Sequence, residues 1–366
     1  MAWRSIISMI FAIFLLNLFL LALALINFFS IRKPDSVQEI SDSVLVLLPM
    51  RNEAVNAERV ISELASQVGL ANMTLLVIDD NSDDGTLEIA SSLQSDRVKV
   101  IQAPQPPLGW IGKVSALHAG FQSEFAQNVD FVISVDADVS FAKSSIAQAV
   151  ATLKRTQLDF ISPYPRQIAI TWSERLVQPL LQWSWMSTLI LRGAEKFPMK
   201  STVVCNGQFL AMRGDALREI GGFTAVATHV LDDIELGRAF VAGGFKGAVI
   251  DGSSLASTRM YSSLNELRAG YGKSLHRAFG SLPGSVVASL FMAATGLIPL
   301  IYALSGDLVA IAALTSILAT RVISAIASSS RIRDSFLHPA SVILFLYLLY
   351  FSWSNRGETQ WKGRTV

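Results

Sequence analysis

The sequence predicts an α/β domain with a mostly parallel sheet, flanked by transmembrane helices. Three observations lead to this fold class. Uncharged apolar runs lie near both ends of the chain, short apolar runs alternate with helical patterns between residues 43 and 260, and polar clusters follow several of those short runs. Such alternation is typical of strands joined by helical crossovers.

The composition fits a membrane protein with a sizeable polar block. Of the 366 residues, 51% are hydrophobic and 16% charged, and the mean hydropathy is +0.43. Soluble domains usually carry about 25% charged residues. A net charge of +1 offers no case for nucleic acid as a partner, and the single Cys205 excludes an internal disulfide framework.

The first apolar run, residues 6–28, contains no charge and is long enough to cross a bilayer. A cleaved signal peptide is the alternative, but its apolar core is normally about 7–15 residues. Further apolar runs occupy 286–304 and 308–326, the second with Arg321 inside it, and a shorter run occupies 340–353.

These runs divide the chain into five regions. They are an anchor (1–33), a large domain of mixed composition (43–260), an amphipathic interfacial helix (261–284), a transmembrane region of two or three segments (285–354) and a basic tail with "WKGR" (355–366). Three C-terminal spans would place the tail outside the cell, whereas two spans and a re-entrant 340–353 would return it to the cytoplasm. The basic tail favours the cytoplasmic side.

The strands of the middle block are predicted from short apolar runs, at 44–49, 74–78, 98–101 and 131–135. Helical spacing or helix-start signals follow each of the first three, over 55–66, 85–94 and 113–126. Ligands in such sheets bind outside the carboxyl ends of the strands. Three clusters fall there: Arg51-Asn52-Glu53, Asp79-Asp80 and Asp136-Ala137-Asp138.

The pair Asp136 and Asp138 in "FVISVDADVS" can face one ligand, since alternate residues of an extended chain point the same way. Mg²⁺ and Mn²⁺ prefer carboxylate oxygens and often complete their coordination with substrate phosphates. An Asx-turn at the strand end uses the same residues and is the alternative.

Two further segments carry candidate chemistry. In "PPLGWIGKVSALHAG" (106–120), a rigid loop leads into a helix whose N-terminus and Lys113 favour an anion; an incidental lysine is the alternative. "HVLDDIELGRAFVAGGF" (229–245) places Asp232, Asp233 and Glu235 close together. They are either a solvated helix start or the source of a general base.

The motifs together resemble those of family 2 glycosyltransferases with the GT-A fold. They are "LLPMRNEA", "VIDDNSDDGT", "GKVSALHAG", "VDADVS", "CNGQFLAMRGDALREIGGF" and "LDDIELGRAFVAGG", in the family's order, over roughly residues 43–280. "PPLGWIGK", "WKGR" and the membrane segments are similar to the membrane-bound subgroup that includes hopanoid-associated and carotenoid-type glycosyltransferases.

The resemblance implies a hexosyltransferase-type enzyme with a UDP- or GDP-sugar donor and Mg²⁺ or Mn²⁺ as cofactor. Donor-binding residues would be Pro49, Arg51, Asn52, Glu53, Asp79, Asp80, Lys113, Asp136 and Ala137. Asp136 and Asp138 would bind the metal, and Asp233 would be the general base of an inverting transfer. The acceptor side would include Asn206, Gly207, Gln208 and Asp232.

The sequence departs from the family's pattern at three places. Asp232 stands where glutamate is frequent, and His118 replaces an asparagine. The Gln-x-x-Arg-Trp motif of the family's processive synthases is absent, which favours the transfer of a single sugar.

The segment 264–280 has an apolar stripe with cations largely off it, as in a helix that lies in the membrane interface. Arg268, Lys273 and Arg277 are expected to contact membrane or phosphate. The tryptophans of 172–191 indicate an interfacial or acceptor-lining segment, with a core helix as the alternative.

The expected protein is a multi-pass enzyme of the inner or plasma membrane with a cytoplasmic catalytic domain, because nucleotide sugars are cytoplasmic. Its acceptor is expected to be a lipid, either isoprenoid-type or glycolipid. A processive polysaccharide synthase and a non-catalytic lipid- or nucleotide-binding homologue remain the alternatives.

Overall fold

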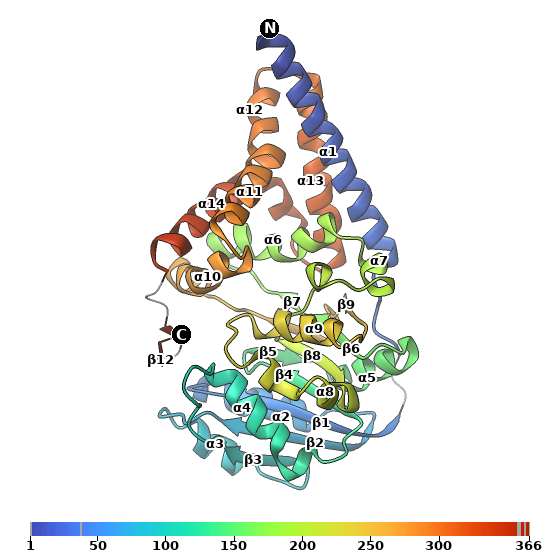
Figure 1. Cartoon of the computed structure of the whole chain (residues 1–366), viewed down its shortest axis with the longest axis vertical. Helices are drawn as coiled ribbons and strands as arrows, with labels where there is room; N and C mark the ends of the chain where they lie inside the picture. The colour runs from blue at the N-terminus through green and yellow to red at the C-terminus, as the bar shows by residue number, and fades with distance from the viewer. Residues whose placement is uncertain (1, 37–38, 357–359, 362–363, 366) are drawn as a thin grey trace. The chain divides into compact units, whose positions relative to one another are not determined.

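The computed structural model of the chain describes residues 2–36, 39–356, 360–361 and 364–365 (Figure 1). It contains two compact units, each assembled from separate segments of the sequence. The sheet unit comprises 31–166 and 191–259, and the helical unit comprises 1–30, 167–190 and 260–365. The expected continuous block 43–260 is therefore interrupted, because 167–190 packs with the helical unit.

A seven-stranded sheet forms the centre of the sheet unit. In spatial order its strands are β3 (Val98–Gln102), β2 (Leu70–Asp79), β1 (Ile40–Met50), β4 (Phe131–Val135), β8 (Phe209–Arg213), β6 (Phe160–Tyr164) and β9 (Gly247–Asp251).

The sheet is mostly parallel, as the sequence predicts. Strand β1 runs parallel to β2 and β4, and β6 runs parallel to β9. Only β8 is reversed: it lies antiparallel to β4 on one side and to β6 on the other, with Val135 opposite Phe209. The N-terminal end of β8 therefore lies at the edge where β1, β2 and β4 end.

Helices cover both faces of the sheet (Figure 1). One face packs on α2 (Ala54–Ala65), α3 (Thr86–Ser92) and α5 (Ser145–Thr156). The other packs on α4 (Gly112–Gln122), α8 (Gly214–Glu219) and α9 (Asp232–Ala242). Because alternate side chains of a strand point to opposite faces, the part of β1 that is covered on both faces, residues 44–48, needs apolar side chains throughout, which explains its continuous apolar run.

Shorter elements complete the sheet unit. They are η1 (Glu124–Ala126), β5 (Val139–Phe141), β7 (Arg166–Gln167, at the boundary of the units), α7 (Leu191–Lys196), η2 (Lys200–Thr202), η3 (Gly222–Val226) and β10 (Ala256–Thr258). Strand β5 follows the D-x-D pair directly and pairs antiparallel with β10.

The helical unit consists of helices throughout its described part, apart from the tail. They are α1 (Ala2–Ser30), α6 (Trp172–Thr188), α10 (Leu264–Ala278), α11 (Leu282–Met292), the π-helix η4 (Ala293–Leu297), α12 (Ile298–Leu304), α13 (Leu308–Ala327), η5 (Ile332–Leu337) and α14 (His338–Ser354). Helix α6 packs on α1, α13 and α14, so its tryptophans Trp183 and Trp185 are buried among helices of this unit.

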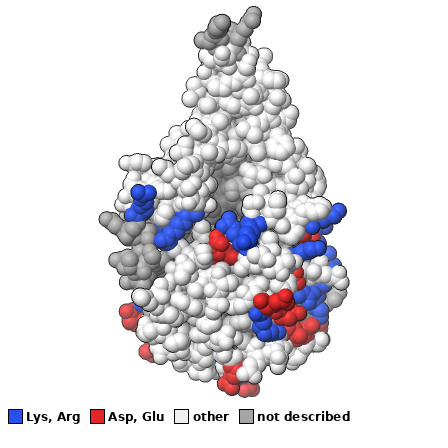
Figure 2. All heavy atoms as spheres, viewed as in Figure 1, with Lys and Arg blue, Asp and Glu red and all other residues white. Residues whose placement is uncertain are grey.

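Among the residues that the structure describes, four helical segments are long and apolar enough to cross a membrane: Ser5–Ser30, Leu282–Leu304, Leu308–Ala327 and Ile332–Ser354. The part of the helical unit around α1 and α12 shows no charged side chain on the face drawn in Figure 2. The last segment, which includes residues 340–353, is helical over its full length.

The apolar stripe of α10 is covered by protein instead of facing the bilayer. Leu267, Tyr271 and Leu275 are buried in a cluster with Leu344 and Leu348 of α14. An amphipathic pattern reports only that one face is apolar, and here a neighbouring helix occupies that face.

In the tail, β11 (Gln360–Trp361) pairs with β12 (Arg364–Thr365). Lys362 and Gly363 of "WKGR" lie outside the described residues.

Candidate active site

The candidate site is the edge of the sheet where β1, β2 and β4 end and β8 begins. Arg51, Asn52 and Glu53 follow β1, and Asp136 follows β4. The reversed direction of β8 brings the preceding segment 206–208 to the same edge, where the N–H of Asp136 donates to the carbonyl of Gln208 at 3.4 Å. We call the group formed by Lys113, Asp136, Asp138, Asp232 and Asp233 the rim cluster.

Lys113 is the single cation of the rim cluster. Its Nζ lies 2.6 Å from Asp136 Oδ1 and 3.8 Å from Asp232 Oδ2. The side chain lies at the first turn of α4, where Ile111 N–H donates to the carbonyl of Ala227 and fixes the entry into the helix. The lysine predicted to meet a phosphate is thus held by carboxylates of two different elements.

Asp233 is held in one orientation by two backbone donors. Gly207 N–H donates to Oδ2 at 2.8 Å, and Ile234 N–H donates to Oδ1 at 2.8 Å. Both Asp232 and Asp233 lie in the first turn of α9, where free backbone N–H groups favour negative charge. Glycine at 207 permits this approach, because a Cβ there would lie 3.0 Å from Lys113 Nζ and 3.4 Å from Asp233 Cβ.

The acceptor-side residues are interlocked. Asn206 Nδ2 donates to Gln208 Oε1, and Gln208 N–H donates to Asn206 Oδ1, each at 2.9 Å. Asn206 N–H also donates to Ser162 Oγ in the middle of β6. The segment that carries Gly207 is therefore rigid, and it connects β6 to the rim cluster.

Negative charge is in excess at this edge. Burial, with the charges of Asp136 and Glu53, raises the pKa of Asp138 to about 7. Burial also raises the pKa of Asp232 to about 6 and that of Asp233 above its ordinary value. Burial alone would lower the pKa of Lys113, but Asp136, Asp232 and Asp233 outweigh it and raise that pKa.

The rim cluster fits a divalent cation as a two-carboxylate site. Within the part of the chain that the structure describes, no three His, Cys, Asp or Glu side chains gather closely enough to hold a metal ion alone. Asp136 and Asp138 would therefore need donor phosphate oxygens and water to complete the coordination, as is usual for Mg²⁺. The excess of carboxylate charge is what a cation would neutralise.

The residues expected on the nucleotide side form a turn network next to the rim cluster. Arg51 donates to the carbonyls of Asp80, at 2.6 Å, and Asn81, at 3.1 Å, tying the end of β1 to the end of β2. Asp79 and Asp80 are fully buried, and Asp79 accepts the N–H of Ser82 at 3.2 Å. Pro49 lies in β1 and is partly exposed.

Arg268, Lys273 and Arg277 belong to α10 of the helical unit. The guanidinium of Arg268 lies over the rings of Phe351, at 4.4 Å, and Tyr347, at 5.8 Å, both on α14. Arg277 is exposed and Lys273 is half-buried. In this structure Arg268 is thus engaged by aromatic rings of the same unit.

Three residues near the site have no strong signal in the sequence. Cys205 is buried, and burial together with Asp233 raises the pKa of its thiol. A Cβ at Gly237 would lie 2.6 Å from Cys205 Sγ, so α9 packs very closely here. Arg59 of α2 contacts the D-x-D turn; the polar residues Asn56, Arg59 and Glu63, one helical turn apart, are the signal that could have revealed it.

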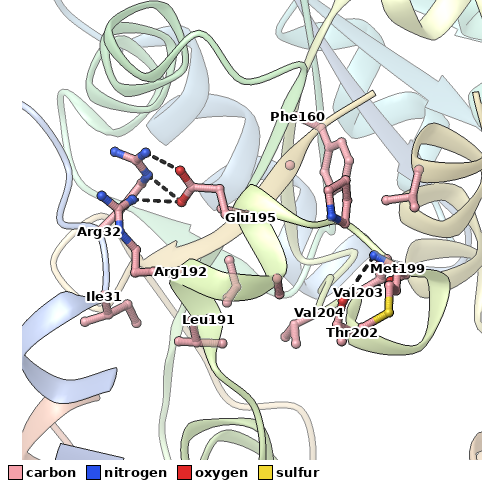
Figure 3. A pocket seen from close by; sticks show the side chains of 16 residues that line it. Ile31, Arg32, Phe160, Leu191, Arg192, Glu195, Met199, Thr202, Val203 and Val204 are labelled. Atoms are coloured by element: carbon pink, nitrogen blue, oxygen red, sulfur yellow. Dashed lines mark hydrogen bonds and ion pairs between the residues drawn. The ribbon is translucent and has the colours of Figure 1, made fainter. Parts of the chain in front are cut away.

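A separate pocket of the sheet unit lies away from these carboxylates (Figure 3). Its lining includes Phe160, Val203 and Val204, with Arg32 and Arg192 paired to Glu195 at one end. Its volume of about 30 Å³ accommodates a few water molecules at most. It is too small for a nucleotide sugar.

Comparison with known proteins addresses the fold and the family. Residues 45–221 match the model of the family "Glycosyl transferase family 2". That match ends before Asp232, so the placement of Asp232 and Asp233 rests on the geometry above.

Two curated proteins are similar to part of the chain. A 4,4'-diaponeurosporenoate glycosyltransferase of Staphylococcus haemolyticus is 27% identical over 234 residues, covering 61% of this chain and 58% of the relative. A dolichol-phosphate mannosyltransferase of Pyrococcus furiosus is 26% identical over 196 residues, covering 53% of this chain and 48% of the relative. The chain thus spans about half the length of these curated relatives.

A solved mannosyltransferase from Pyrobaculum calidifontis, in complex with GDP-Man and Mn²⁺, shares the fold. Its TM-score is 0.54 at 15% sequence identity, with 97% of this chain and 98% of that chain covered. With the mostly parallel sheet, this likeness shows that the chain has the GT-A fold, and residues 45–221, from β1 to α8, carry a family 2 glycosyltransferase domain.

Proposed function

We propose that the protein is an inverting, metal-dependent membrane glycosyltransferase that moves a single sugar from a nucleotide-diphosphate sugar to a lipid acceptor. The observation that carries this proposal is the rim cluster, in which four aspartates from two segments, the turn after β4 and the start of α9, surround one lysine of α4. The family match indicates the class of reaction, which is glycosyl transfer. The rim cluster contains residues for binding the donor and for activating the acceptor.

The donor half would use Asp136 and Asp138. With Mg²⁺ or Mn²⁺ bound, the cation would neutralise the diphosphate as it leaves. Lys113 lies next to Asp136 and would add positive charge on the same side. Glu53, Asp79 and Asp80 would contact the nucleoside, whether uridine or guanosine. The solved mannosyltransferase of the same fold contains GDP-Man and Mn²⁺, which agrees with this class of donor.

The acceptor half would use Asp233 as general base. Its carboxylate is fixed by Gly207 and Ile234, and its raised pKa brings it nearer to neutrality, where a base is most effective. Asp233 takes the proton of the acceptor hydroxyl while that oxygen bonds to the anomeric carbon. The bond from this carbon to the phosphate oxygen breaks, and the nucleoside diphosphate leaves with the electron pair. Attack opposite the leaving group inverts the configuration.

The helical unit supports the proposal of a lipid acceptor. Four segments are suited to crossing a bilayer, and the names of both curated relatives contain an isoprenoid compound. Because nucleotide sugars are cytoplasmic, the sheet unit would face the cytoplasm from an inner or plasma membrane. Arg32 and Lys33, directly after α1, agree with the positive-inside rule.

The decisive experiment is mass spectrometry of lipid extracts from cells that express the wild-type protein, the Asp233→Asn variant or no protein. One new lipid mass, increased by a single sugar and present only with the wild-type chain, is expected. A ladder of sugar additions would replace the single transfer by a processive synthase. Identical lipid profiles in all three cultures would favour a non-catalytic homologue.

A further inference from the structure

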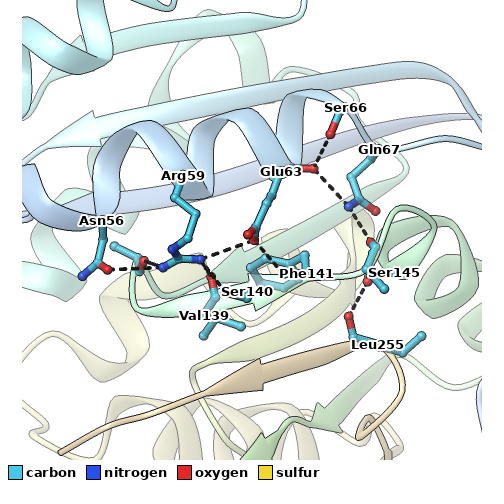
Figure 4. Close-up of polar contacts among 12 residues, drawn as sticks. Asn56, Arg59, Glu63, Ser66, Gln67, Val139, Ser140, Phe141, Ser145 and Leu255 are labelled. Atoms are coloured by element: carbon cyan, nitrogen blue, oxygen red, sulfur yellow. Dashed lines mark hydrogen bonds and ion pairs between the residues drawn. The ribbon is translucent and has the colours of Figure 1, made fainter. Parts of the chain in front are cut away.

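One face of α2 carries a row of polar side chains that forms hydrogen bonds with the segment containing and following the D-x-D pair. Asn56, Arg59, Glu63 and Gln67 are spaced three, four and four residues apart, so they lie above one another along the helix and its end. The last three bond residues 137–146 in the same order as they occur along the helix, as Figure 4 shows in part. We call these four residues the α2 polar row.

The inner end of the α2 polar row is buried and structural. Gln67 is 1% exposed; its Nε2 donates to the carbonyl of Ala142 at 2.7 Å, and its Oε1 accepts the N–H of Ile146 at 3.1 Å. Glu63 Oε2 accepts the N–H of Phe141 at 2.9 Å. These bonds anchor β5 and the start of α5.

The outer end of the row contacts the D-x-D turn itself. Arg59 donates to the carbonyl of Ala137 at 3.3 Å and to the carbonyl of Val139 at 3.0 Å, which are the two residues flanking Asp138. A third bond, at 2.7 Å, reaches Ser140 Oγ. A planar guanidinium can hold several acceptors in a fixed geometry, which a lysine cannot do.

The same guanidinium is connected to the nucleotide side. It donates to Asn56 Oδ1 at 3.3 Å, and Asn56 Nδ2 donates to Glu53 Oε2 at 2.9 Å. Arg59 therefore links two carboxylates, Glu53 and Asp138, whose charges act on each other. Its side chain is 36% exposed, so the packing of the core does not require it.

We propose that Arg59 is a positioning residue that fixes Asp138 and Glu53 relative to each other, and thereby couples metal binding to nucleotide binding. The proposal rests on the proposed function, in which Asp138 holds the metal and Glu53 the nucleoside. Arg59 itself touches neither ligand. Its effect is transmitted through the backbone at Ala137 and Val139 and through Asn56.

The test compares Arg59→Gln and Arg59→Lys with a matched control, Arg97→Gln. Arg97 also donates to two backbone carbonyls of the α2 region, those of Ala65 and Gln67, but it does so at the far end of the row and does not bond the D-x-D turn. The control loses two bonds to backbone carbonyls, as Arg59→Gln does, without touching residues 137–140.

Two measurements on the full-length protein are informative. Calorimetric titration with UDP and GDP, with and without Mn²⁺, should show nucleotide binding at least tenfold weaker for Arg59→Gln in Mn²⁺ and little changed without it. Hydrogen exchange of the metal-free protein should show faster exchange over residues 137–142. Arg59→Lys should recover part of both effects, and Arg97→Gln should resemble the wild type in both while lowering Tm.

The proposal would be overturned if Arg59→Gln left both nucleotide binding and hydrogen exchange unchanged. It would also be overturned if the variant bound nucleotide equally weakly with and without Mn²⁺. Asp138→Ala is measured alongside to separate the two hypotheses. If Asp138→Ala keeps Mn²⁺-dependent binding, the proposed metal site is wrong; if only Arg59→Gln keeps it, the metal site stands and the role of Arg59 is wrong.

Discussion

The sheet unit and the helical unit bury polar groups in opposite ways. In the helical unit several buried polar side chains bond across helices: Asn17 Nδ2 of α1 donates to the carbonyls of Thr295 and Ala313, each at 3.0 Å. Trp183 Nε1 donates to Thr320 Oγ1 at 2.7 Å. The terminal nitrogens of Arg321 and both ring nitrogens of His338 have no hydrogen-bond partner within the described part of the chain.

The rim cluster of the sheet unit is unbalanced instead, with four aspartates around one lysine. Buried polar groups that satisfy one another hold helices together, whereas buried charges of one sign in excess need a ligand to complete them. Pairing between polar groups thus indicates residues that maintain the fold, whereas an excess of one charge indicates residues that bind a ligand.

The largest expected effect comes from Asp233→Asn, which keeps the size of the side chain but removes the base. Transfer should fall by about 10²–10⁴-fold, the usual contribution of general acid–base catalysis. Donor binding, measured by calorimetry, should persist. Turnover equal to that of the wild type would refute the assignment of Asp233.

Asp136→Ala and Asp138→Ala should weaken Mn²⁺-dependent donor binding by about 10–100-fold, a loss typical of damaged metal sites. Binding without metal should change little. The measurement is a donor titration at several Mn²⁺ concentrations. Metal dependence identical to that of the wild type would count against the pair as ligands.

The charge imbalance also predicts a pH dependence of stability in metal-free protein. Because the pKa of Asp232 is about 6 in the folded state and 3.8 ordinarily, the folded state binds more protons between these values. The free energy of unfolding should therefore fall as pH rises from about 4 to 6. In the Asp232→Asn variant, the fall in the free energy of unfolding over this pH range should be smaller by on the order of 1–3 kcal/mol.

This slope is measured by denaturant unfolding in a chelator. A variant with the same slope as the wild type would mean that Asp232 does not contribute to it.

The smallest effect is expected in the helical unit. Asn17→Leu removes two interhelical hydrogen bonds and should lower the free energy of unfolding by about 0.5–2 kcal/mol. Mn²⁺-dependent donor binding should stay at its wild-type value once the protein is folded. If folded Asn17→Leu lost donor binding, the hydrogen bonds of Asn17 would also serve ligand binding. The functional distinction between the helical unit and the rim cluster would then be wrong.

Much of the sheet could be predicted because its signals are local. The apolar runs at 44–49 and 74–78 are needed for strands that are buried on both faces, and the D-x-D pair directly follows such a run. The position of each strand end then follows from parallel pairing. For this reason the rim with Asp136 was predictable without coordinates.

The remaining features depend on contacts between residues that are far apart in the sequence. Nothing near Phe209 indicates that β8 runs antiparallel between β4 and β6. Arg59 meets the carbonyl of Ala137 from another element, and the stripe of α10 is apolar whether lipid or α14 covers it. Helical periodicity identifies an apolar face but not its occupant.

The reversed β8 also imposes an order of events during synthesis. Strand β6 pairs with β8 and β9 alone, so it has no ladder partner until residues 209–213 have been made. Between β6 and β8 the ribosome makes residues 167–190, which belong to the helical unit. At about 5–20 residues per second, the time between the synthesis of β6 and that of β8 is several seconds. A nascent chain acquires Asp233 later still. The rim cluster is therefore completed only after β6 can pair with β8, and an unfinished chain lacks Asp233, the proposed base.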